Sequence, residues 1–168
     1  MREDHDTGPI ERLLRDDHAR LDTLLTRATD DAGAYAEFRR GLLRHIGMEE
    51  KLLLPAARRA RDGQPLPEAA RLRLDHGALA ALLVPTPTPT ILRALRGILS
   101  RHNAVEEGPG GVYAVCDRLV GNEVDTLLAA LEATPAVPVS AHVDSELVMD
   151  AARRALARAG YALEDFQD

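Results

Sequence analysis

Histidine and glutamate recur in this sequence at spacings that could build a metal site. The segment 17–25, which reads Asp-His-x-x-Leu-x-x-Leu-Leu, recurs at 75–83. The segment 44–50, which reads Arg-His-x-x-x-Glu-Glu, recurs at 101–107, so the two offsets of 58 and 57 residues nearly agree. The repeat predicts two equivalent helical hairpins, each giving one histidine from its first helix and a His-x-x-x-Glu pair from its second.

Six of these polar residues fall on the apolar seams of the predicted helices. A carboxylate buried there without a partner would cost roughly several kcal/mol, and a metal ion removes that cost. One core histidine or one His-x-x-x-Glu pair is commonplace, but a matching set of four histidines and two glutamates is poorly explained by coincidence. Because residues four apart lie on consecutive helical turns, each pair can converge on one ion or bridge two. The predicted ligands are His18, His45, Glu49, His76, His102 and Glu106.

Other polar residues have weaker claims to the site. His5 and His142 fall in a predicted tail and linker, where we expect solvated side chains. Glu50 and Glu107 point about 100° away from the predicted ligands, which favours surface salt bridges. Asp22, one turn after His18, is either an acceptor for an imidazole N–H or an exposed acid.

Two residues follow a Gly-Pro-Gly-Gly segment at 108–111 that should break or kink the last bundle helix. Tyr113 lies seven residues after Glu106 and would face the site if the helix continued, but the expected break argues against this. Cys116 is the sole cysteine and has no base nearby in sequence, so we expect a buried, inert thiol.

The composition and the positions of the helix-breaking residues indicate the helices that must position these side chains. Apolar residues make up 45% of the 168 residues but aromatic ones only 3%, so Leu, Ala, Val and Ile must build the core, which favours helices. The prolines between 85 and 89 require an extended connector. The predicted helices span 9–30, 35–62, 68–84, 91–107 resuming at 112–132, and 145–159.

Charge and cysteine content exclude several classes of protein. The net charge of -6 is mixed along the chain, which argues against a nucleic-acid partner. A single cysteine allows neither an internal disulfide nor a thiolate cage, so a metal would need nitrogen and oxygen ligands. With no apolar leader or membrane-length segment, we expect a cytoplasmic protein, and the arginine-rich, alanine-rich composition suggests a bacterial source.

The order His, His-x-x-x-Glu, His, His-x-x-x-Glu between about Ile10 and Leu131 resembles the hemerythrin-like (HHE cation-binding) family. The resemblance implies an all-α fold, an up-down-up-down four-helix bundle, which we place in residues 1–133. From the sequence itself we expect 134–168 to form a linker and a C-terminal amphipathic helix. The resemblance also implies two iron ions in a non-haem, oxo- or hydroxo-bridged centre, with zinc or manganese as substitutes. Oxygen-carrying members look to have a further histidine on the third helix, where this sequence has Ala80.

The resemblance leaves several functions open. The leading hypothesis is a di-iron protein that binds, senses or scavenges O₂, NO or peroxide, or stores iron, as a monomer or weak homodimer. One alternative is a di-iron oxidase or peroxidase, which is less favoured because no separate acid, base or substrate-binding motif is found. The other is a structural bundle in which the metal only holds the helices together. No catalytic residue is assigned. The ferritin-like Glu-x-x-His motif and the zinc-protease His-Glu-x-x-His motif do not occur.

Overall fold

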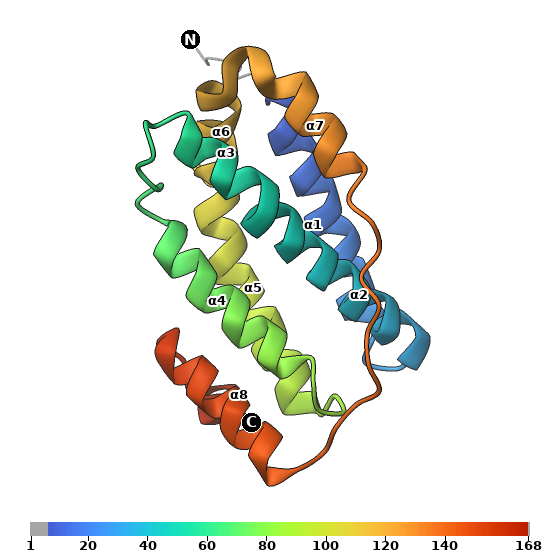
Figure 1. Cartoon of the computed structure of the whole chain (residues 1–168). Helices are drawn as coiled ribbons and strands as arrows, with labels where there is room; N and C mark the ends of the chain where they lie inside the picture. The colour runs from blue at the N-terminus through green and yellow to red at the C-terminus, as the bar shows by residue number, and fades with distance from the viewer. Residues whose placement is uncertain (1–6, 168) are drawn as a thin grey trace.

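The computed structural model describes residues 7–167, and every regular element in that part of the chain is helical (Figure 1). This confirms the all-α class. The elements are α1 (Pro9–Arg27), α2 (Ala32–Met48), the π-helical η1 (Glu49–Leu53), α3 (Leu54–Arg59), α4 (Ala69–Leu82), α5 (Pro89–Glu107), α6 (Val112–Val120), η2 (Gly121–Glu123), α7 (Val124–Glu132), α8 (Glu146–Arg158) and η3 (Leu163–Phe166). Among the described residues, no helix is both long and apolar enough to span a bilayer.

The starts of four helices are determined by residues in or next to their first turn. Pro9 and Pro89 lie at the first positions of α1 and α5, where a missing N–H costs nothing. The side chains of Asp31, Thr88 and Ser145 accept hydrogen bonds from the first turns of α2, α5 and α8. These starts agree with the predicted helices to within a few residues.

Two breaks differ from the predicted helices. The helix expected at 112–132 is divided at Gly121, whose positive φ of 50° ends α6 before η2 and α7 begin. The helix expected at 35–62 contains the π-helical turn η1, where the backbone N–H of Leu54 bonds to the carbonyl of Glu49. Pro55 explains this wide turn, because proline has no N–H with which to continue the α-helical ladder.

The buried side chains form two hydrophobic clusters with a polar layer between them. Leu14 and Met48 belong to one cluster, and Leu21 and Leu42 belong to the other. His18 therefore lies between the clusters on α1, and the other predicted ligands lie at the same level of the core. Close-packed leucines on both sides of this layer limit the entry of water.

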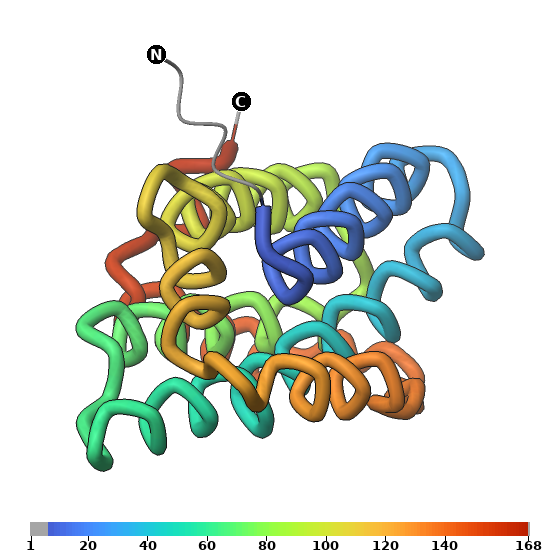
Figure 2. The backbone as a smooth tube through the Cα atoms, turned by 90° about the horizontal axis from the view of Figure 1, so that it is seen from above, coloured from blue at the N-terminus to red at the C-terminus, as the bar shows by residue number. Residues whose placement is uncertain are grey.

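The segments that follow α5 cover the end and one side of the bundle. Viewed from above, α6 and η2 cross the end of the bundle, and α7 packs against α1 and η1 (Figure 2). The chain then runs along the surface to α8, which packs on α4, while η3 packs on α5 (Figure 1). Leu156 of α8 is fully buried, and the exposed Arg153, Arg154 and Arg158 lie on the solvent face of this helix.

Candidate metal centre

The six predicted ligands all lie buried in the polar layer at the middle of the bundle. His18 comes from α1 and His76 from α4, so each first helix of the repeat gives one histidine. His45 and Glu49 come from consecutive turns of α2 and η1, and His102 and Glu106 do so on α5. Each residue is at most 5% exposed, so its polar atoms need partners inside the protein instead of water.

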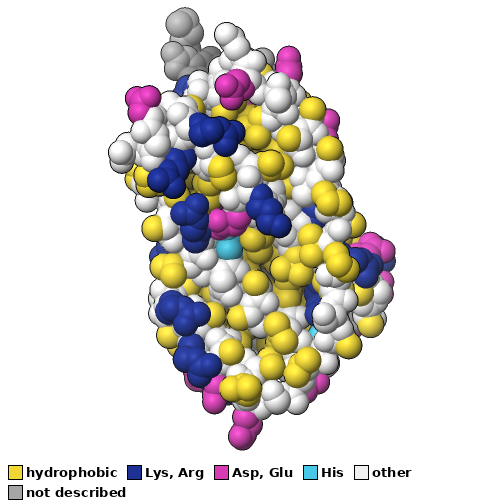
Figure 3. Space-filling view, in the orientation of Figure 1, with side chains coloured by type: hydrophobic (Ala, Val, Ile, Leu, Met, Phe, Trp, Pro, Cys, Tyr) yellow, Lys and Arg dark blue, Asp and Glu magenta, His cyan; other side chains and the backbone are white. Residues whose placement is uncertain are grey.

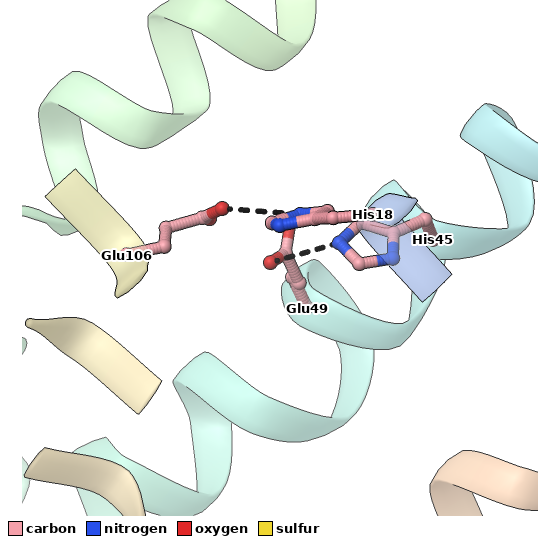
Figure 4. Close-up of side chains that lie close together, drawn as sticks. All are labelled: His18, His45, Glu49 and Glu106. Atoms are coloured by element: carbon pink, nitrogen blue, oxygen red, sulfur yellow. Dashed lines mark ion pairs between the residues drawn. The ribbon is translucent and has the colours of Figure 1, made fainter. Parts of the chain in front are cut away.

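One half of the site contains His18 and His45. The Nε2 atom of His18 lies 3.5 Å from Glu106 Oε2, and the Nε2 atom of His45 lies 3.3 Å from Glu49 Oε1 (Figure 4). One donor atom from each of these four residues lies within 4.8 Å of the others. The imidazoles meet the two carboxylates from different helices, as ligands around one ion would.

The other half contains His76 and His102. The Nε2 atom of His76 lies 3.0 Å from Glu49 Oε2, and that of His102 lies 3.1 Å from Glu106 Oε1. The two Nε2 atoms are 3.2 Å apart. One donor atom from each of His76, His102 and the two glutamates again lies within 4.8 Å of the others. Each glutamate thus gives one oxygen to each half, as a carboxylate that bridges two ions would.

Four outer carboxylates bind the Nδ1 atoms of the four histidines. Asp17 Oδ2 lies 2.8 Å from Nδ1 of His45, and Asp75 Oδ2 lies 3.2 Å from Nδ1 of His102. Glu50 Oε1 lies 2.7 Å from Nδ1 of His76. Glu107 Oε1 pairs in the same way with Nδ1 of His18. An Nδ1–H donated to a carboxylate fixes the tautomer and leaves the Nε2 lone pair free to bind a metal.

These pairings change the roles expected for the neighbouring acids. Glu50 and Glu107 do form salt bridges, with Arg73 at 3.0 Å and Arg15 at 3.9 Å, but they also hold histidines of the site. Asp22 is not an imidazole acceptor: its side chain is 74% exposed and lies 3.9 Å from Arg96. The internal repeat contained a signal for these four outer carboxylates that the sequence analysis missed. An acidic residue lies next to each predicted ligand histidine of α1 and α4 and next to each predicted ligand glutamate.

Tyr113 points into the first half of the site, contrary to the expectation drawn from the glycine-rich break. Its hydroxyl donates to Glu49 Oε1 at 2.5 Å, and Oη lies 3.0 Å from Glu106 Oε2. The same oxygen lies 3.1 Å from His18 Nε2 and 3.2 Å from His45 Nε2. The side chain is fully buried, so a phenol belongs to the inner surface of the site.

The break at 108–111 places Tyr113 there instead of turning it away. A Cβ atom at Gly108 would lie 2.6 Å from the carbonyl oxygen of Ala104, and one at Gly111 would lie 2.5 Å from that of Glu106. Glycine therefore allows a tight turn that restarts the helix close to its previous end. One turn after Tyr113, Asp117 accepts from the first backbone N–H groups of α1 and fixes α6 beside that helix.

The electrostatics of the site reflect its crowded carboxylates. Burial lowers the pKa of His45, but the charge of Glu49 and the hydrogen bond to Asp17 outweigh it and bring the pKa to about 10. Burial likewise opposes the rise of the pKa of His102 to about 10, which comes from its hydrogen bond to Asp75 and from the charges of Glu106 and Glu49. Burial and the charge of Glu49 raise the pKa of Glu106. Protons thus compensate charges that a cation would otherwise balance.

The remaining candidates lie elsewhere. The ring of His142 stacks on that of Tyr35 with centroids 5.9 Å apart, and this histidine belongs to neither cluster of donors. His5 lies outside the described residues. Cys116 is buried, and its burial raises the pKa of the thiol to about 12, which agrees with the inert thiol that we expect.

The residues present fit a pair of metal ions. The donors are imidazole nitrogens and carboxylate oxygens, which suit iron, manganese and zinc. Glu49 Oε2 and Glu106 Oε1 are buried without a hydrogen-bond donor, and both face the second half of the site. A buried carboxylate oxygen without a donor is costly, and a cation between it and the facing imidazole would satisfy both.

Fold and site together define a helical bundle with a buried cation-binding centre. The family model for the hemerythrin HHE cation binding domain matches residues 10–109, which is more than half of the chain. The chain therefore belongs to the hemerythrin HHE cation-binding family, as the sequence resemblance implied. Neither the curated proteins nor the solved structures include a significant match to it.

Proposed function

We propose that this chain is a cytoplasmic non-haem di-iron protein that binds, senses or scavenges O₂, NO or peroxide, or stores iron. The centre would lie in an up-down-up-down four-helix bundle within residues 1–133, with 134–168 as a helical extension. Its proposed ligands are the six residues predicted from the repeat. Bound iron would supply redox chemistry and affinity for small diatomic ligands or peroxide.

One observation carries the proposal: all four imidazoles turn Nε2 toward the oxygens of Glu49 and Glu106 while their Nδ1 atoms bind outer carboxylates. A neutral imidazole that donates from Nδ1 has only a lone pair at Nε2. In the metal-free protein, protons offset the carboxylate charge at His45 and His102, and cations placed between the Nε2 lone pairs and the facing carboxylate oxygens would replace these protons and stabilise all four contacts.

The surrounding residues determine how the centre is held and reached. The outer carboxylates orient the imidazoles and increase their basicity. The two leucine-rich clusters exclude bulk water from both sides. A surface groove between α1 and α5 has His18 and Glu107 in its lining, which gives a small ligand a route toward the site. On the face shown in Figure 3, a small part of a histidine side chain is exposed next to an acidic side chain, and basic side chains lie on both sides of this acid.

We do not propose a simple oxygen carrier. Ala80 lies on α4 one turn after His76, where oxygen-carrying members look to have another histidine ligand. A centre with fewer protein donors keeps more positions for water or exogenous ligands, which favours sensing or scavenging over reversible transport.

Metal analysis combined with optical spectroscopy tests the proposal. Protein produced in iron-replete medium and exposed to air should contain about two irons per chain, by analogy with other bundle-core di-iron sites. It should show ferric charge-transfer bands in the near ultraviolet, and NO or peroxide should perturb them. Stoichiometric zinc, or no metal after anaerobic reconstitution with Fe(II), would instead indicate a structural bundle. Peroxide turnover coupled to the oxidation of a second substrate would favour the oxidase or peroxidase alternative.

A further inference from the structure

The phenol of Tyr113 makes the two halves of the centre unequal. Its oxygen contacts His18, His45 and one oxygen of each glutamate, all at 2.5–3.2 Å. Among the described residues, no hydroxyl takes the same place at His76 and His102, whose facing carboxylate oxygens have no hydrogen-bond donor. The site thus has five inward donors on one side and four on the other.

The distances around Tyr113 Oη are those between neighbouring ligands on one ion. Two adjacent donors on a six-coordinate ion with bonds of about 2.1 Å lie about 3 Å apart, and each donor has four such neighbours. Three neighbours of Oη lie at 3.0–3.2 Å, and the fourth, Glu49 Oε1, lies at 2.5 Å because it accepts the hydrogen bond of the phenol. Within the set, His45 Nε2 lies 3.3 Å from Glu49 Oε1 and His18 Nε2 lies 3.5 Å from Glu106 Oε2. The phenol oxygen therefore lies where a fifth donor to that position would be.

The internal repeat shows that this feature belongs to one half only. Tyr113 follows Glu106 by seven residues, and the residue seven after Glu49 is Ala56. Ala56 is buried and offers no donor. Tyr113 also lies beyond the segment 10–109 that the family model matches, so the phenol is additional to the matched pattern.

We propose that Tyr113 is a seventh protein ligand, which binds through Oη the metal ion held by His18 and His45. The inference rests on the proposed di-iron function. When ferric iron binds, the metal–oxygen bond forms and the phenolic proton leaves to solvent, with no change of oxidation state. The ion at His18 and His45 then has five protein donors, and the ion at His76 and His102 has four.

Resonance Raman spectroscopy of the air-oxidised, iron-loaded protein tests this ligand, because a phenolate bound to ferric iron gives a visible charge-transfer band that enhances tyrosine ring vibrations. The sequence contains three tyrosines, so two matched controls are available. We expect the band in wild type, in Tyr35→Phe and in Tyr161→Phe, and its loss in Tyr113→Phe. Mössbauer spectra should show two inequivalent ferric sites in wild type.

Each result decides the question. Two bound irons without phenolate vibrations, or vibrations that persist in Tyr113→Phe, would overturn the ligand assignment and leave the di-iron function intact. A protein that binds no iron would overturn both. If Tyr113→Phe does not fold, the double variant Tyr35→Phe/Tyr161→Phe retains Tyr113 as its sole tyrosine, and its spectrum decides.

Discussion

The carboxylate of Asp17 lies 2.8 Å from Nδ1 of His45, on the helix next to the one that carries Asp17. Asp75 stands in the same relation to His102 at 3.2 Å. Each aspartate directly precedes a proposed ligand of its own helix, so one dipeptide contains a proposed ligand and also orients the proposed ligand of the neighbouring helix. The two helices of each hairpin are thereby tied together at the site.

Replacing Asp17 with Asn should weaken metal binding. An amide oxygen accepts the hydrogen bond from Nδ1–H of His45 more weakly than a carboxylate does. Substitution of a residue that orients a metal ligand in this way typically lowers the metal affinity by about 10–100-fold. Competition with a chelator measures the affinity. Asp22→Asn is the matched control, because this acid on the same helix is 74% exposed and should leave the affinity unchanged. Equal effects of the two substitutions would contradict the role given to Asp17.

Replacing His45 or His102 with Ala should sharply reduce the metal content of the protein. Each change removes one imidazole donor and leaves the buried carboxylates partly uncompensated. Metal content per chain, measured on folded protein, should fall well below the wild-type value. His142→Ala should retain the wild-type content, because His142 stacks on Tyr35 outside the donor clusters. A similar loss in all three variants would refute the ligand assignment.

The metal-free protein should lose stability as the pH rises from about 6.5 toward 10. His45 and His102 have a folded pKa of about 10, above the unfolded value of 6.5, so their stabilisation is complete below 6.5 and disappears as the pH passes through 10. The loss is on the order of 1 kcal/mol per pH unit for each imidazole. Urea melts of chelator-treated protein at pH 6.5 and 8.5 measure it. His142→Gln should keep the wild-type slope, and a free energy of unfolding that rises with pH would contradict the prediction.

Truncating Leu156 should destabilise the whole protein. This side chain of α8 is fully buried and belongs to the cluster that also contains Leu79 and Ile98. Leu156→Ala should lower the free energy of unfolding by about 2–5 kcal/mol through lost burial and a residual cavity. Leu147→Ala, on the same helix but 75% exposed, should change it by less than about 0.5 kcal/mol. Unchanged stability in Leu156→Ala would mean that α8 is not integral to the core.

Much of the inner site could be predicted from spacing alone. The repeat placed six residues on helical seams, and a helix of 3.6 residues per turn brings His45 and Glu49 to one face whatever its partners are. Local chemistry also set several helix starts, since Pro9, Thr88 and Ser145 act on the first turn of the helix that each of them begins or precedes. These features depend on residues close in sequence, so the sequence by itself determined them.

The outer carboxylates and Tyr113 were decided only by the tertiary structure. Asp17 and Glu107 bind histidines that are 28 and 89 residues away, and such distant pairings depend on how whole helices pack. Tyr113 reaches the site because Gly108 and Gly111 allow a turn too tight for a Cβ, a contact that spacing does not reveal. Periodicity within one helix specifies a face, whereas the partner that meets this face is set by packing across the bundle.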